Sequence, residues 1–193
     1  MMPPLDYLKY YDLERYLFDD VHEHFRKDCS IGAFDFFSIV IWKANRAKSK
    51  IAHNLMGKHA LPGESDLESI VRRLTKSLYV ASDHRERLRL LLKDWGFRLP
   101  MASAILTVLW PEDFTVYDTR VCEQIKRFHG MADWTDFDRL WKGYNEYKNE
   151  VIGAAPNALS LRDKDRYLWA RSAAEQLRED IKKGFPTRDS SAS

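Results

Sequence analysis

The chain has 193 residues, of which 45% are hydrophobic, 31% charged and 13% aromatic, and this composition fits one compact domain or two small lobes sharing a core. The chain has only eight glycines and seven prolines, and aromatic residues are abundant. This composition excludes the collagenous, low-complexity and disordered classes. The longest apolar run, 101–110, is too short to cross a bilayer, and the N-terminus has no basic and apolar secretory leader. Two cysteines cannot form a disulfide framework or a four-thiolate metal site. We therefore expect a soluble, cytoplasmic protein with no cofactor, no metal and no membrane partner.

Charge is unevenly distributed, although the net charge is only +2. Residues 1–35 carry a net charge of −4, residues 36–98 carry +7 and residues 99–193 carry −1. No acid occurs between Asp35 and Glu64, a stretch with five basic residues: Lys43, Arg46, Lys48, Lys50 and Lys58. A local basic excess is typical of proteins that bind a polyanion such as DNA. A solvated helix face that only maintains solubility has the same pattern, and charge alone favours that explanation.

Apolar residues recur at helical spacing along the whole chain. The helices we predict are 5–27, 34–55, 65–80, 83–95, 100–110, 118–130, one beginning at Thr135, and one from Ser160 to about Gly184. No segment alternates with period two for long enough to form a sheet. The sequence therefore predicts an all-α fold of about eight helices.

Capping signals mark several of these helix starts and ends. Ser65 with Glu68, Asp83 with Glu86 and Ser160 with Asp163 are candidate capping boxes. The break before the third helix is Pro62-Gly63, the fourth helix is stopped by Gly96, and Pro100 suits the first turn of the fifth. Only 187–193 has the composition of a disordered tail.

The most informative segment is 92–106, which is typical of a helix, a tight glycine-containing hairpin and a second helix that begins with small residues. A hairpin that opens onto a helix N-terminus points backbone N–H groups outward, and such groups bind phosphate without any side chain. Asp118 follows at the predicted start of the next helix.

These residues resemble the helix-hairpin-helix DNA glycosylase superfamily, with the endonuclease III and 8-oxoguanine glycosylase-like fold. The family hairpin is usually Leu-Pro-Gly-Val-Gly-x-Lys-x-Ala, followed by an apolar helix and Val-Asp-x-x-Val. Gly96 matches the first glycine, Ala102 the small helix residue and Asp118 the catalytic aspartate. The motif spans 92–121, and the order of helices resembles the family over residues 30–180.

The sequence departs from the family pattern at two hairpin positions. Arg98 stands where the second glycine is usual, which implies a differently bent hairpin. Pro100 stands where bifunctional members carry their Schiff-base lysine, which excludes lyase chemistry through that residue. The four cysteines of the iron–sulfur cluster in some relatives are missing. The resemblance thus implies a monofunctional enzyme with one glycosylase-like domain of two helical lobes over 1–186. The hairpin residues it implies for contact with double-stranded DNA are Gly96, Arg98, Met101, Ala102 and Ser103, and the basic stretch adds Lys43 and Arg46.

The proposed role of Asp118 agrees with general chemistry. Cleavage of an N-glycosidic bond passes through an oxocarbenium-like state, and a fixed carboxylate stabilises the growing positive charge or activates water. The alternative is a plain helix N-cap worth about 1 kcal/mol, because Asp is a preferred capping residue. The hairpin upstream favours catalysis over the plain cap.

A flipped base needs an aromatic surface for stacking and polar groups for its edge. If 34–55 is one helix, Trp42, Asn45 and Arg46 share a face and offer such groups, although a core Trp42 with solvated charges is the commoner arrangement. Further candidates for the base pocket are Tyr117, Arg120, Asp165 and Trp169. For Asp165, an ion pair with Arg162 at the start of its helix is the simpler explanation.

The function we expect is a monomeric, monofunctional DNA glycosylase that flips and hydrolytically excises a modified base. The chain resembles small bacterial glycosylase-like proteins more than the housekeeping repair enzymes, and some members of that wider group act in phage defence on bulky bases such as glucosylated hydroxymethylcytosine. An oxidised, alkylated or deaminated base is equally compatible with the residues. The alternative function is a non-catalytic helical DNA-binding or adaptor protein that retains the hairpin, as Arg98 and Pro100 favour.

Overall fold

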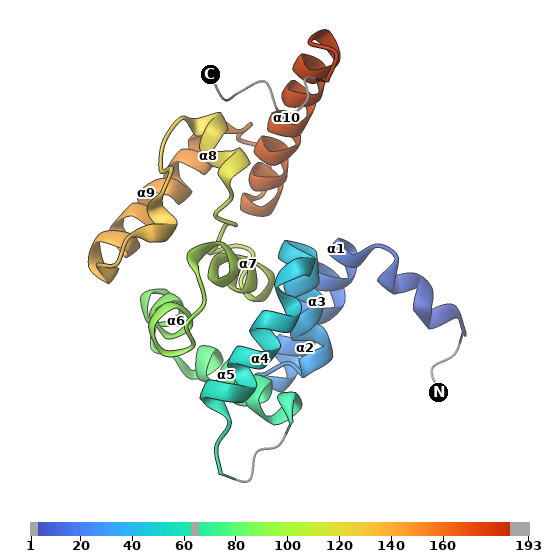
Figure 1. Ribbon diagram of the computed structural model, residues 1–193, viewed down its shortest axis with the longest axis vertical. Helices are drawn as coiled ribbons and strands as arrows, with labels where there is room; N and C mark the ends of the chain where they lie inside the picture. The colour runs from blue at the N-terminus through green and yellow to red at the C-terminus, as the bar shows by residue number, and fades with distance from the viewer. Residues whose placement is uncertain (1–3, 63–65, 186–193) are drawn as a thin grey trace. The chain divides into compact units, whose positions relative to one another are not determined.

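A computed structural model describes residues 4–62 and 66–185, and over these ranges the chain is helical and contains no strand (Figure 1). The prediction of an all-α fold with about eight helices and no sheet is confirmed for this part of the chain. The α-helices are α1 Leu13–Tyr16, α2 His22–Asp28, α3 Ala33–Ala44, α4 Lys48–His59, α5 Leu67–Val80, α6 His84–Arg89, α7 Leu99–Leu109, α8 Thr119–Ile125, α9 Phe137–Ala154 and α10 Leu161–Lys182. Shorter 3₁₀ or π segments are η1 Pro4–Tyr10, η2 Leu17–Val21, η3 Asn45–Ala47, η4 Leu90–Asp94 and η5 Met131–Asp133. The predicted disordered tail at 187–193 lies outside the described residues.

The chain divides into two compact units, residues 1–116 (unit 1) and residues 117–193 (unit 2). Unit 1 therefore contains the hairpin, and unit 2 begins one residue before Asp118. In the described part of the chain, no helix combines the length and the apolar character needed to cross a membrane.

Helix α7 is the centre of unit 1. Every residue of 101–109 is buried, and the helix packs against α2, α3, α6 and η2 (Figure 1). Its sequence contains no charged residue, so it can be surrounded on all sides by apolar partners. Two of its polar side chains are satisfied within the helix, since Ser103 donates to the Pro100 carbonyl and Thr107 to the Ser103 carbonyl.

Two predicted long helices are interrupted in the structure. The segment 5–27 divides at Asp12, whose side chain accepts a hydrogen bond from the N–H of Arg15 and starts a new helix (3.1 Å). The segment 34–55 divides at Ala44, whose φ of −161° and ψ of 79° take it out of the helix between α3 and η3. Periodicity did not show these breaks, because apolar spacing continues through both.

Helix caps explain most of the other boundaries. The N-caps predicted at Asp83 and Ser160 form, with Asp83 accepting from the N–H of Glu86 (2.7 Å) and Ser160 from that of Asp163 (3.1 Å). Ser65 lies outside the described residues, and the N-cap of α5 is Asp66.

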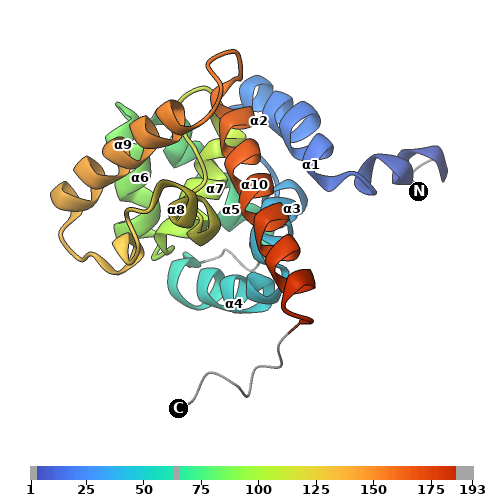
Figure 2. The ribbon, with the colours of Figure 1, turned by 90° about the horizontal axis from the view of Figure 1, so that it is seen from above.

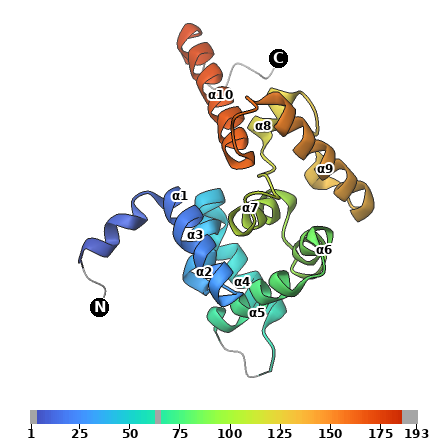
Figure 3. The same ribbon diagram turned by 180° about the vertical axis from the view of Figure 1, so that it is seen from behind.

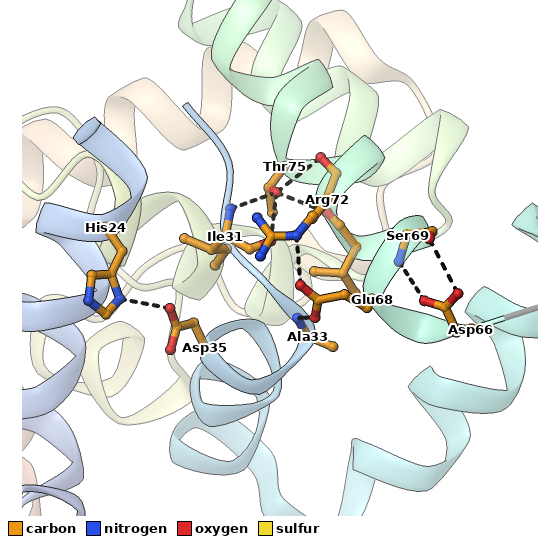
Figure 4. A network of polar contacts seen from close by, with 10 residues as sticks. His24, Ile31, Ala33, Asp35, Asp66, Glu68, Ser69, Arg72 and Thr75 are labelled. Atoms are coloured by element: carbon orange, nitrogen blue, oxygen red, sulfur yellow. Dashed lines mark hydrogen bonds and ion pairs between the residues drawn. The ribbon is translucent and has the colours of Figure 1, made fainter. Parts of the chain in front are cut away.

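Glu68, predicted to belong to the Ser65 box, instead joins α5 to α3. Its Oε2 accepts a hydrogen bond from the N–H of Ala33 (2.7 Å) at the first turn of α3, and its Oε1 pairs with Arg72 (2.6 Å; Figure 4). The neighbouring Thr75 is bound to both the N–H and the carbonyl of Ile31 (Figure 4). These contacts fix the start of α3 against α5, which lie close together in Figure 3.

In unit 2, α8 and α9 both pack against α10 (Figure 2). The buried ammonium group of Lys164 in α10 donates to the carbonyl of Ile152 in the last turn of α9 (2.8 Å). Asp165 is buried beside it and is paired with Arg162 (2.8 Å), as the spacing predicted. Buried polar contacts thus stabilise the junction between α9 and α10.

Candidate nucleic-acid interface and active site

The hairpin turns at Gly96. The N–H of Trp95 donates to the carbonyl of Leu90 (2.9 Å) and that of Phe97 to the carbonyl of Leu91 (2.9 Å), so the end of η4 folds back on itself. Gly96 has a φ of +70°, in the left-handed region that favours glycine. No atom lies within 4 Å of where its Cβ would be, so the backbone angle alone selects glycine there.

The start of α7 offers fewer backbone groups to phosphate than the sequence suggests. Arg98 is the N-cap, and Pro100 in the first turn has no N–H. The N–H groups of Met101 and Ala102 both donate to the Arg98 carbonyl (3.0 Å each). The side chains of Met101, Ala102 and Ser103 are buried, which corrects their placement among the DNA-contacting groups. Of the predicted hairpin contacts, Gly96 and Arg98 are exposed.

The C-terminal end of α4 lies beside the hairpin. The imidazole of His59 is 4.6 Å from the indole of Trp95, centroid to centroid, and the guanidinium of Arg73 lies 5.2 Å from the same indole. Arg73 also donates to the carbonyl of His59. Burial lowers the pKa of His59, and the charges of Arg73 and Lys58 lower it further. Local patterns could not find this contact, because it joins residues far apart in sequence.

Through this contact the basic helix α4, which contains no acidic residue, lies next to the hairpin within unit 1. The basic side chains of α4 are exposed at both of its ends: Lys48, Lys50 and Lys58. Arg46 precedes the helix in η3 and is exposed, while Lys43 at the end of α3 is half-buried. Five cations thus occur along 43–58 without an intervening carboxylate.

The predicted stacking face on 34–55 is wrong, because the break at Ala44 separates its members. Trp42 is on α3, half-buried, and packs edge-to-face against Phe18 (5.8 Å between centroids). Asn45 is in η3, where its side-chain oxygen accepts from the ammonium of Lys48 (2.7 Å). Trp42 is therefore part of the packing of unit 1, and Asn45 belongs to the basic surface.

In unit 2, three of the predicted site residues lie together. Asp118 is the half-buried N-cap of α8, and its Oδ1 accepts a hydrogen bond from the N–H of Arg120 (3.0 Å). The guanidinium of Arg120 lies 5.6 Å from the indole of Trp169 in α10, which is 47% exposed. Gln176, further along α10, accepts a hydrogen bond from Arg120 (2.8 Å) and fixes its position. Asp118 thus contacts the backbone of Arg120, and the side chain of Arg120 reaches the exposed ring of Trp169 on α10.

The other two predicted pocket residues of unit 2 belong to its interior. Tyr117 is buried, donates to the carbonyl of Phe128 (2.7 Å) and packs edge-to-face on Tyr147. Burial raises the pKa of Tyr117 to about 12. Asp165 is buried and paired with Arg162, as described above. Neither side chain is exposed for a base to contact, which corrects their assignment to the pocket.

The arrangement around Asp118 can stabilise positive charge and bind a planar group. Among the described residues, no group of three or more His, Cys, Asp and Glu side chains is placed to hold a metal ion. No protein-family model, no curated protein and no solved structure matches the chain.

Proposed function

We propose that the protein is a monofunctional DNA glycosylase that flips a modified base out of a duplex and hydrolyses its N-glycosidic bond. The observation that carries the proposal is the order of elements along 84–125: a helix, a turn on left-handed Gly96, the helix α7, and then Asp118 at the first turn of α8. A phosphate-binding turn followed by a carboxylate suits an enzyme that holds the backbone while it acts on a sugar.

Duplex binding in this proposal uses unit 1. The hairpin residues Gly96 and Arg98 contact one stretch of backbone, and the cations from Lys43 to Lys58 contact neighbouring phosphates. The ring contact between His59 and Trp95 supports this assignment, since it holds the basic helix beside the hairpin. The same contacts are independent of base sequence, as expected for a protein that searches DNA for a rare base.

Excision in this proposal uses unit 2. The Asp118 carboxylate stabilises the oxocarbenium-like sugar as the base leaves and orients the attacking water. Trp169 offers an aromatic face for the extruded base, and Arg120 offers hydrogen-bond donors to its edge. No lysine stands at the position of Pro100, so the product is an intact abasic strand rather than a strand cut by β-elimination. The substrate class suggested by the resemblance is a bulky modified cytosine, such as the glucosylated bases of phage DNA.

A non-catalytic DNA-binding protein is the second candidate function. It is favoured by the start of α7, where Arg98 and Pro100 replace residues of the family hairpin and two N–H groups are already bonded to the Arg98 carbonyl. In that case Asp118 serves only as the cap of α8.

The test compares two aspartates that both cap a helix N-terminus. Asp118 and Asp136 are both N-caps in unit 2, and Asp136 accepts from the N–H of Arg139 (2.7 Å) just as Asp118 accepts from that of Arg120. Asn caps helices about as well as Asp, so Asp118→Asn and Asp136→Asn should both fold. We expect wild type and Asp136→Asn to excise, and Asp118→Asn to lose at least about 100-fold in rate while its DNA affinity holds or rises.

The assay incubates each protein with duplexes that carry oxidised, alkylated, deaminated or glucosylated bases, and reveals abasic sites by alkali cleavage. Strand breaks should appear only after alkali. Full excision by folded Asp118→Asn would overturn the role of Asp118. Tight duplex binding by the wild type with no excision of any base would favour the adaptor.

A further inference from the structure

Helix α10 has a second face that the described residues of unit 2 leave uncovered. Its buried residues include Leu168 and Ser172, and Ser172 faces α8 through Glu123 (3.4 Å). At 3.6 residues per turn, the positions on the opposite side are 167, 170, 174, 177 and 181. All five are apolar or aromatic and all are exposed: Tyr167, Ala170, Ala174, Leu177 and Ile181. We call these five residues the α10 seam.

The spacing of the α10 seam is that of a coiled coil. Its steps of three, four, three and four residues place the members at successive a and d positions of a heptad. Leu177 and Ile181 are 52% and 60% exposed, so this face of α10 presents two aliphatic side chains to solvent. The C-terminal half of α10 extends beyond α8 and α9 in Figure 2. Such a face fits a second helix with the same pattern.

From this seam we infer that two copies of the chain pair through α10 as an antiparallel, two-fold symmetric coiled coil, in place of the monomer expected from the sequence. With the two-fold axis at Ser172, Ala170 of each copy lies opposite Ala174 of the other, so the backbones approach closely at the centre. Tyr167 of each copy then packs on Leu177 of the other, outside the alanines. In this register Tyr167, Ala170, Ala174 and Leu177 of the seam are buried between the copies, while Ile181 of each copy lies opposite Asp163 of the other at the edge of the pair.

Charge complementarity favours the same pairing. Arg166 and Asp180 flank the seam on one side, and in the antiparallel register Arg166 of one copy faces Asp180 of the other, twice about the axis. On the other side the two Arg171 side chains approach each other, but each is paired with its own Glu175 (2.9 Å). A parallel pair would instead set Arg166 beside Arg171 of the second copy, which repel. The antiparallel dimer is therefore the arrangement that the flanking residues select.

The dimer is independent of the proposed function, because the seam lies on the face of α10 opposite the one that packs on α8. Trp169 and Gln176 are not part of the seam. Excision and dimerisation can therefore each fail without the other.

The first experiment measures the mass of the full chain by light scattering and sedimentation over a series of concentrations. We expect wild type to reach twice the mass of the 22.7 kDa chain. Leu177→Glu/Ile181→Glu should raise the dimer dissociation constant at least about 100-fold, since the new charge at 177 would be buried against Tyr167 and the one at 181 would lie opposite the carboxylate of Asp163. The matched control is Lys183→Glu, which changes the net charge by the same amount at an exposed position off the seam and should leave the dimer unchanged. A wild type that stays monomeric, or a dimer that the double variant does not weaken, overturns the inference.

A second experiment tests orientation. In a Cys29→Ser background, which leaves only the buried Cys122, Ala170→Cys protein is mixed with Ala174→Cys protein and oxidised gently. The antiparallel pair gives predominantly mixed 170–174 disulfides. A preference for 170–170 and 174–174 disulfides would overturn the antiparallel register.

Discussion

Helices α7 and α10 are held in their units in opposite ways. In α7, an uncharged helix of 11 residues, the whole of 101–109 is buried by neighbouring helices. In α10, with 22 residues, four are buried, and three of these are polar: Lys164, Asp165 and Ser172. Its links to α8 include hydrogen bonds, such as those of Gln124 to Glu175 and of Arg120 to Gln176. Apolar burial therefore holds α7, which follows the hairpin, whereas polar contacts contribute more to holding α10, which carries Trp169. We expect substitutions in the two helices to have different effects.

The largest expected difference is in the free energy of unfolding. Ile105→Ala in α7 leaves a cavity in a fully buried position and should cost about 2–5 kcal/mol. The same change at Ile181 in α10, measured at a concentration where the chain is monomeric, should cost less than about 0.5 kcal/mol because the side chain is exposed. Chemical denaturation followed by circular dichroism measures both. Similar losses of unfolding free energy at the two positions would contradict the difference in burial between α7 and α10.

The two units that contain these helices should also differ in their contribution to DNA binding. Replacing Lys43 and Arg46 by Ala should lower the slope of log affinity against log salt by about 0.9 for each phosphate that the protein no longer neutralises. Replacing Arg171 and Arg178 on α10 removes the same charge from exposed positions of unit 2 and should leave the slope unchanged. Fluorescence anisotropy with a labelled duplex over a salt series gives both values. If the first pair has no effect on the slope, the basic surface is only a solvated face.

Two glycines of unit 1 provide a sharper test of the hairpin. Neither Gly96 nor Gly57 has any atom within 4 Å of a Cβ, but Gly96 has a φ of +70° and Gly57 is within α4. Gly96→Ala should therefore destabilise by about 1–2 kcal/mol through backbone strain, and should weaken duplex binding. Gly57→Ala should stabilise by about 0.5–1 kcal/mol, since Ala is the better helix former. Thermal denaturation shows whether each variant is more or less stable than the wild type. A stabilising effect of Gly96→Ala would contradict the left-handed conformation of Gly96.

The smallest effect concerns pH and the interior of unit 2. Burial raises the pKa of the Cys122 thiol from 9.0 to about 11. The folded state thus keeps a proton that the unfolded chain loses, so this stability is fully present below pH 9 and is lost as the pH rises through 11. By about pH 10 the loss should be about 1 kcal/mol. Cys122→Ala should reduce the fall in stability between about pH 8 and about pH 10, and an unchanged fall would show that the thiol does not contribute.

The sequence predicted the structure correctly where residues close together in the chain determine it. The caps at Asp83, Asp118 and Ser160 formed as predicted, because a side-chain oxygen two or three residues before an N–H can bond it without help from the rest of the chain. The Arg162–Asp165 pair formed for the same reason. In the candidate site, the position of Gly96 in a left-handed turn and of Asp118 at a helix start were both predictable.

The predictions failed where burial or a distant partner decided the outcome. Met101, Ala102 and Ser103 follow the hairpin in sequence, but neighbouring helices cover them. Glu68 was expected to cap its own helix, and instead it binds the first turn of α3, 35 residues away. Tyr117 flanks Asp118 in sequence, but its ring points into the interior of unit 2.

The sequence by itself determined that this protein is helical, where most of its helices begin, and where a glycine turn precedes a capped aspartate. These properties depend on backbone angles and on hydrogen bonds between residues a few positions apart. Only the tertiary structure decided that α4 meets the hairpin through His59 and Trp95, that Arg120 lies over Trp169, and that one face of α10 remains uncovered. The physical reason is that side-chain exposure depends on which helices pack together, and periodicity along one helix does not specify its neighbours.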